Sequence, residues 1–246
     1  MRWRLLATGL ATYAVVLVFT LPATLIDAML HGVGDGRLRL AEAQGTLWSG
    51  SGQLEIRDAA GHRGVAKSIA WRVMPLPLLG GHLVCEVELD QAPKRFPVTI
   101  SLSRVEIADA DTGLPAAVLG FIVPTLAPLE LTGEMLIHAA NVSIGRSRMR
   151  GNVTLQWRAA GSALTPVAPL GDYELRIDGQ EALVRATLRT LQGPLQLDGK
   201  GEWSYGQKPV ILATARIPSQ HQQQLAPLLR LIGVERNDGS FELQLK

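Results

Sequence analysis

The hydrophobic pattern divides the chain into an apolar start and a long remainder in which apolar and polar residues alternate. Residues 5–26 contain no charged side chain. As a helix this run would be roughly 33 Å long, enough to cross a hydrocarbon core of about 30 Å. We therefore predict a transmembrane anchor at residues 5–26, with apolar side chains that include Leu5, Leu6, Val15, Val16, Leu17, Phe19 and Leu21.

The charges around this run predict its orientation. Arg2 and Arg4 precede it, and no Lys or Arg follows before Arg37. The positive-inside rule then places residues 1–4 in the cytoplasm and the rest of the chain in the periplasm. A cleaved signal peptide is the alternative, but the run exceeds the usual apolar core of about 7 to 15 residues and no A-x-A site follows. We expect the anchor to be retained and residues 27–36, polar and rich in glycine, to form a linker.

After the linker the dominant period is two, which is typical of half-buried antiparallel strands. Residues 37–246 are therefore expected to form a periplasmic, mainly β domain. Its largely antiparallel sheet would be curved, either as a sandwich or as a groove-like meander. The stretches that alternate most clearly are residues 37–40, 53–57, 86–90, 99–103, 130–132, 152–157, 173–177, 183–189 and 241–245.

Two short segments break this period and predict helices. One covers residues 114–122, with Pro115 as its opening residue, and the other covers residues 222–232 after Ser219. Gly233 would end the second helix.

Glycine recurs beside tryptophan in a weak internal repeat. Residues 45–52 read GTLWSGSG and residues 195–203 read LQLDGKGEW. Glycine inside a strand marks a bulge, a bend or a close backbone approach, as we expect at Gly45, Gly52, Gly133, Gly199 and Gly201. The favoured interpretation is that tryptophans fill the concave side of the sheet, and the alternative is a tryptophan-lined groove that receives a partner strand or a lipid chain. The tryptophans concerned are Trp48, Trp71, Trp157 and Trp203.

Composition adds little chemistry. The 24 Lys and Arg residues nearly balance the 22 Asp and Glu residues and are dispersed, so no nucleic-acid partner is indicated. The single cysteine, Cys85, lies in an alternating stretch and is expected to be a buried, inert thiol. The five histidines are scattered, and no metal site, cofactor site or catalytic motif is predicted. An enzyme is therefore the least favoured class of function.

The distinctive residues that remain are glycines and tryptophans in stretches that run in order along nearly the whole chain. These motif residues are Gly45, Trp48, Gly50, Trp71, Gly171, Gly193, Pro194, Gly199, Gly201 and Trp203, with residues 228–233 and Gly239 near the end. Together they resemble the type II secretion system protein N family. One departure is residues 210–215, after Pro209, where the family pattern would place an aromatic residue and a glycine.

The resemblance implies a single-pass accessory component of the inner membrane. Such a component supports export of folded proteins from the periplasm across the outer membrane and binds other components of the secretion machine. The glycine-punctuated strands also look like AsmA-type β-groove proteins. That likeness gives the alternative of a membrane-tethered protein that binds or conveys lipid.

Overall fold

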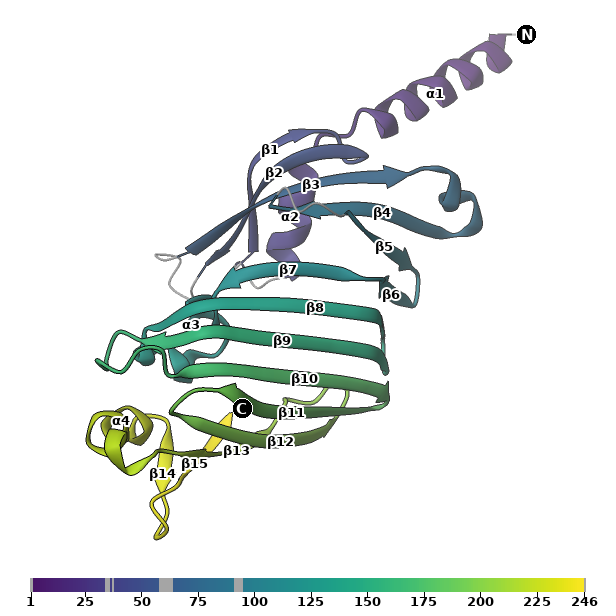
Figure 1. Cartoon of the computed structure of the whole chain (residues 1–246). Coiled ribbons are helices and arrows are strands. Elements are labelled where there is room, and N and C mark those ends of the chain that lie inside the picture. Colours follow the sequence, from purple (N-terminus) through teal and green to yellow (C-terminus); the bar gives the residue numbers. More distant parts are fainter. Residues whose placement is uncertain (1, 34–35, 37, 58–63, 91–94, 246) are drawn as a thin grey trace. The chain divides into compact units, whose positions relative to one another are not determined.

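The computed structural model describes residues 2–33, 36, 38–57, 64–90 and 95–245. The chain forms two compact units, which we call unit 1 (Met1–Val98) and unit 2 (Thr99–Lys246). Figure 1 labels the helices and strands of both units. Both are built on antiparallel strands, so the prediction of a mainly β protein with few short helices is confirmed.

Unit 1 begins with two helices, α1 (Arg2–Phe19) and α2 (Thr24–Val33). The apolar run at residues 5–26 is therefore divided between two helices. The break lies at Pro22, which has no N–H to donate and restricts the residue before it. Around this proline the backbone pairs with the β1–β2 turn, because Leu47 N donates to Leu21 O (2.8 Å) and Ala23 N donates to Gly45 O (3.3 Å).

The structure also bears on the expected linker and on the expected membrane-spanning helix. Residues 27–33, expected to be linker, belong to α2, while residues 34, 35 and 37 lie outside the described residues. Among the described residues, no helix combines the length and the apolar character needed to cross a membrane.

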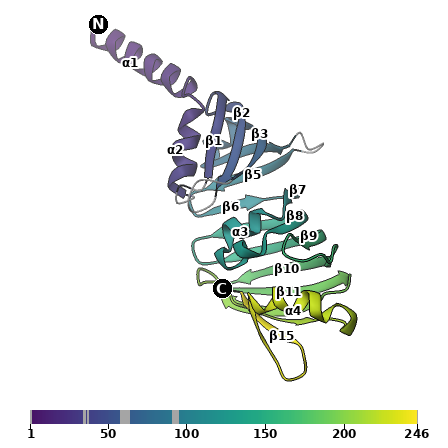
Figure 2. The same ribbon diagram turned by 90° about the vertical axis from the view of Figure 1, so that its left-hand side faces the viewer.

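The sheet of unit 1 has the order β1-β2-β3-β4. These strands are β1 (Leu38–Gly45), β2 (Ser49–Arg57), β3 (Gly64–Met74) and β4 (His82–Leu89), with a 3₁₀ turn, η1 (Leu76–Gly80), before β4. A further strand, β5 (Phe96–Ser101), runs across the division between the units. Helix α2 lies beside β1 (Figure 2) and covers a core of Ala23, Leu40 and Trp71. Around this core pack Ile26, Leu30, Ala43, Ile69, Val73 and Cys85.

One carboxylate fastens α2 to the sheet. Asp27 Oδ1 accepts hydrogen bonds from Leu40 N (2.8 Å) and from Arg39 Nε (3.2 Å). The Leu40 amide first and the Arg39 guanidinium second lower the pKa of the Asp27 carboxyl below its ordinary value. The helix is therefore held to β1 by a charged contact as well as by its apolar side chains.

In unit 2, β6 and β7 both pair with β8, and the order continues β8-β9-β10-β11-β12-β13-β15-β14. Helices α3 and α4 lie at the same end of the strands (Figure 1). The strands are β6 (Arg104–Ile107), β7 (Ala110–Pro115), β8 (Leu131–Gly145), β9 (Met149–Ser162), β10 (Gly171–Glu181), β11 (Leu183–Gln192), β12 (Gln196–Ser204), β13 (Ile211–Arg216), β14 (Gly233–Glu235) and β15 (Phe241–Leu245). The helical segments are α3 (Val118–Ile122), η2 (Pro124–Leu129), η3 (Ser219–His221) and α4 (Gln222–Arg230).

Every predicted strand falls on a strand of the structure, with shifted ends. The helix expected at residues 222–232 is confirmed as α4, which buries Leu225, Leu228 and Leu229. The helix expected at residues 114–122 is too long, because Leu114 and Pro115 end β7 and only residues 118–122 are α-helical. The apolar pattern around Leu114 fits a helix or a strand equally well. Leu114 forms a strand because it pairs with Met135 on β8.

The glycines expected to interrupt strands occur in two kinds of surroundings. Gly133 lies at a shift of register between β8 and β9, which confirms a bulge there. Gly199 and Gly201 lie instead in a regular ladder and face β13 closely. Residues 210–215, the departure from the family pattern, supply β13, whose Ile211, Ala213 and Ala215 are buried. Ala213 pairs with Gly199 and Ile211 pairs with Gly201, so buried side chains of β13 lie opposite the glycines of β12.

We predict that Gly201→Val lowers the melting temperature of the chain. A Cβ atom at Gly201 would lie 2.6 Å from Val210 O and 3.0 Å from Ile211 Cγ1, so β13 would have to move. The cost should be about 1–3 kcal/mol, as for other overpacked sites. Lys200→Val is the matched control, since Lys200 is exposed on the same strand. Equal melting temperatures for the two variants in circular dichroism would contradict this account of Gly201.

Candidate functional site

The first group of motif residues meets in unit 1. Trp71, on β3, lies opposite Gly50 on β2. A Cβ atom at Gly50 would lie 2.5 Å from Cζ2 of Trp71, so the indole needs glycine there. The Trp71 Nε1 donates to the carbonyls of Thr46 and Leu47, each at 3.2 Å. The indole thus packs in the core and also holds the β1–β2 turn, which Gly45 enters with φ of +91°.

Trp48 has a different place from the one predicted. It lies in the β1–β2 turn instead of on a strand, and it is half-buried. Its Nε1 donates to Val18 O (2.9 Å) at the end of α1, and its ring lies 5.7 Å from that of Phe19. Trp48 therefore braces α1 against the turn and does not fill a groove.

The second group of motif residues meets in unit 2. Gly193, which with Pro194 forms the β11–β12 turn, leaves no room for a Cβ atom because it lies against the Gly171 backbone. Leu195 N donates to Leu170 O (3.0 Å), and the Tyr173 hydroxyl donates to Leu195 O (2.9 Å). Burial first and the Asp172 charge second raise the pKa of the Tyr173 hydroxyl, so it remains a donor. Two motifs that are 22 residues apart in the sequence thus form one packed corner.

The four tryptophans expected on the concave side differ in burial. Trp71 is buried at 7% exposure, whereas Trp48, Trp157 and Trp203 are half-buried. The Trp157 and Tyr173 rings lie 5.8 Å apart and are tilted by 52°, and Trp157 Nε1 donates to Thr132 O (2.9 Å).

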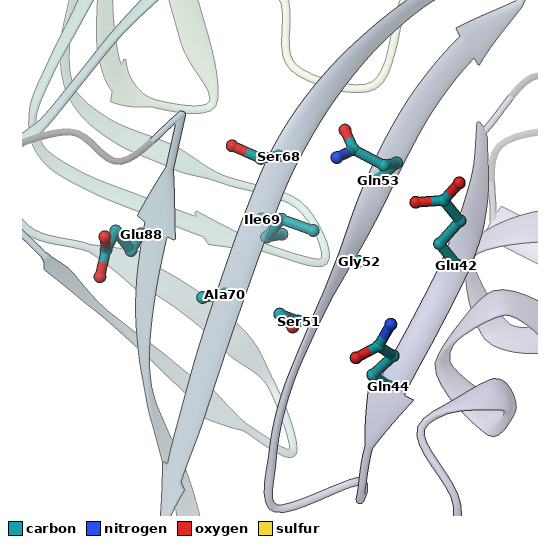
Figure 3. Close-up of a pocket in the computed structure, with 9 residues that line it drawn as sticks. All are labelled: Glu42, Gln44, Ser51, Gly52, Gln53, Ser68, Ile69, Ala70 and Glu88. Atoms are coloured by element: carbon teal, nitrogen blue, oxygen red, sulfur yellow. The ribbon is translucent and has the colours of Figure 1, made fainter.

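A polar cavity of about 360 Å³ lies on unit 1 (Figure 3). The register places Ser51, Ala70 and Glu88 side by side on one face, while Trp71 and Ile69 point to the face covered by α2. Glu88 accepts a hydrogen bond from Arg95 Nε (2.8 Å). The cavity offers carboxylates and neutral donors, a surface suited to a polar partner. Its polar lining residues are Glu42, Gln44, Ser51, Gln53, Ser68 and Glu88.

The sheet of unit 2 has a polar face and an apolar face. Two neighbouring rows of side chains, one on each face, show this difference. On the polar face Glu174, only 3% exposed, accepts hydrogen bonds from Gln156 (3.2 Å) and Arg189 (2.9 Å) and pairs with Arg176 (2.7 Å). Burial alone would raise the pKa of Glu174, but those hydrogen bonds and the charges of Arg176 and Arg189 lower it. The sheet is thus fastened across β9, β10 and β11 by one ionised carboxylate.

On the opposite face an apolar row crosses four strands. Ile137 pairs with Leu155, Leu155 with Leu175, and Leu175 with Leu188. All four side chains are half-exposed. We call these four residues the apolar row; side chains of this kind suit the centre of an interface or a contact with an acyl chain.

Metal-ligand groups and the reactive state of the one cysteine can be assessed in the described part of the chain. There, no group of three or more His, Cys, Asp or Glu residues could hold a metal ion. Cys85 is half-buried beside the Trp71 core, and burial raises the pKa of its thiol, which disfavours the reactive thiolate.

The sequence analysis did not predict two features of the structure. One is the set of hydrogen bonds and ion pairs around Glu174, which joins residues from three strands and therefore depends on how the strands pair. The arginines at positions 146, 148 and 150 were visible in the sequence, and their close spacing was the signal for a basic surface.

The fold is that of a mainly β protein built of open antiparallel sheets. Comparison with known families then identifies the family within this broad class. The model of the family described as type II secretion system (T2SS), protein N, matches residues 36–244, and the chain therefore belongs to this family. Comparisons with curated proteins and with solved structures found no match.

We predict that Trp71→Ala costs about 3–5 kcal/mol of stability, the range for emptying a large aromatic site in a core. Trp203→Ala is the comparison, and because Trp203 is half-buried it should cost less, about 1–2 kcal/mol. Thermal unfolding followed by circular dichroism measures both. A larger loss from Trp203→Ala than from Trp71→Ala would overturn the assignment of Trp71 as the core tryptophan.

Proposed function

We propose that this protein is an inner-membrane accessory component of the type II secretion system. It supports export of folded proteins from the periplasm across the outer membrane by binding other components of the machine. The observation that carries this proposal is the family match over residues 36–244, which covers most of the chain.

Two surfaces support action by protein–protein contact. The apolar row of unit 2 provides half-exposed apolar side chains without a charged group among them. The cavity of unit 1 provides hydrogen-bonding groups around Glu42 and Glu88. Interfaces between proteins combine an apolar centre with polar surroundings, and each unit offers one part of that chemistry.

We also propose that α1 attaches the protein to the inner membrane, with unit 2 in the periplasm. The α1 side chains that support attachment are apolar and exposed: Leu6, Leu10, Tyr13, Val16, Leu17 and Phe19. The side chains of Leu5 and Val15 lie outside the described part, and Leu21 is half-buried at the helix break.

A second apolar segment supports attachment at the same end of unit 1. Met74, Leu76 and Leu78 are exposed around η1, and residues 73–85 contain no Asp, Glu, Lys or Arg. Val73 N donates to Trp48 O (2.7 Å), so Trp48, which also bonds the end of α1, joins both apolar segments. Tryptophan is frequent at the boundary between membrane and water.

Attachment predicts that the full chain stays in the membrane pellet after alkaline carbonate extraction. A phosphatase fused after the last residue should be active, and the mature protein should begin near Met1. Val16→Asp should weaken retention, because a charge in an apolar segment is costly, whereas Leu191→Asp on exposed β11 should not. A mature N-terminus beyond Ile26 would refute the retained anchor.

Lipid binding is the second candidate function, and the apolar row is the observation that favours it. A row of half-exposed Ile and Leu side chains across four strands could lie along an acyl chain. The family match favours the secretion role, since residues 36–244 include most of both units.

The secretion role predicts that the tagged full-length chain, isolated from cross-linked membranes of cells that contain a type II secretion system, carries other components of that system. Trp71→Ala should lose them together with the fold, whereas Lys200→Val should keep them. Recovery of folded chain with phospholipid and without any secretion component would favour the lipid function instead.

A further inference from the structure

A basic cavity of about 310 Å³ lies in unit 2, at the β8–β9 turn and the start of β6. Four arginines line it: Arg104, Arg146, Arg148 and Arg150. Three hydroxyl groups, those of Ser103, Ser143 and Ser147, complete its polar lining, and none of the described lining residues carries a carboxylate.

The strand register explains why these residues converge. Arg104 on β6 lies opposite Gly145 on β8, and Ser143 on β8 lies opposite Arg150 on β9. Gly145 N donates to Arg148 O (2.8 Å), which closes the turn that carries Arg146 and Ser147. The cavity is thus built on paired strands and a hydrogen-bonded turn.

The positive charge of this cavity is only partly balanced. Arg104 Nε contacts Glu106 (2.9 Å), while Arg148 (3.7 Å) and Arg150 share Glu181. Arg146 forms no ion pair within the part of the chain that the structure describes. Four guanidinium groups therefore face two carboxylates, both outside the lining, and two positive charges remain for a ligand.

We propose that this cavity binds a phosphate group. Guanidinium groups match phosphate oxygens with paired, charge-assisted hydrogen bonds, and serine hydroxyls can donate to a third oxygen. A carboxylate has two oxygens, and at Glu181 two guanidinium groups already bind them, so the larger set of donors in this cavity suits phosphate better. The volume has room for the phosphate with part of the molecule that bears it. The source is either a phospholipid headgroup or a free phosphate-bearing solute.

The test uses the full-length chain in neutral detergent, with four probes titrated by calorimetry. These are inorganic phosphate, dihexanoyl phosphatidylglycerol, dihexanoyl phosphatidylcholine and a glutamate-rich peptide. Arg146→Gln should weaken phosphate binding about tenfold or more, since it removes charge-assisted hydrogen bonds. Arg185→Gln is the matched control, because Arg185 is exposed on β11 of the same unit and pairs with Glu202, outside the cavity.

The outcomes separate the two sources. Tighter binding of the phosphatidylglycerol probe than of inorganic phosphate, lost in Arg146→Gln, would identify a headgroup site, and the reverse order would identify a free solute. Absence of saturable binding, equal weakening by Arg185→Gln, or equal binding of a glutamate-rich peptide would overturn the proposal. Unchanged melting temperatures show that the variants are folded, and none of these results depends on binding to secretion components.

Discussion

Antiparallel backbone pairing, with side chains that alternate between two faces, is the constraint on which both units depend. In unit 1 it places Trp71 and Ile69 under α2 and leaves Ser51, Ala70 and Glu88 on the other face. In unit 2 the same alternation separates the row that contains Glu174 from the row that contains Leu175. A shift of one residue would exchange these faces, so register determines which surface a partner can meet.

Register is in turn fixed by close contacts between glycine and neighbouring groups. Trp71 over Gly50 fixes the β1–β2 turn, and Gly193 against Gly171 fixes the corner of β10, β11 and β12. Trp71, Gly50, Gly171 and Gly193 thus make structural contacts in this chain.

The sequence predicted the strands well because alternation is a local property that survives folding. It predicted helix α4 from the spacing of Leu225, Leu228 and Leu229, but it placed Leu114 in a helix because pairing with Met135 is not visible locally. Only the fold shows that Trp71 is central, that Trp48 contacts α1, and that the residues around Glu174 meet across three strands.

The central claim is that the exposed surfaces of this scaffold bind components of the secretion machine, and the apolar row is the place to test it. A photo-cross-linking amino acid at Leu155 would sample that row in living cells, and the same amino acid at exposed Thr187, on the opposite face, is the control. The account predicts a protein adduct from position 155 that contains a secretion component, and little adduct from position 187. Adducts at position 155 that contain only phospholipid would contradict it.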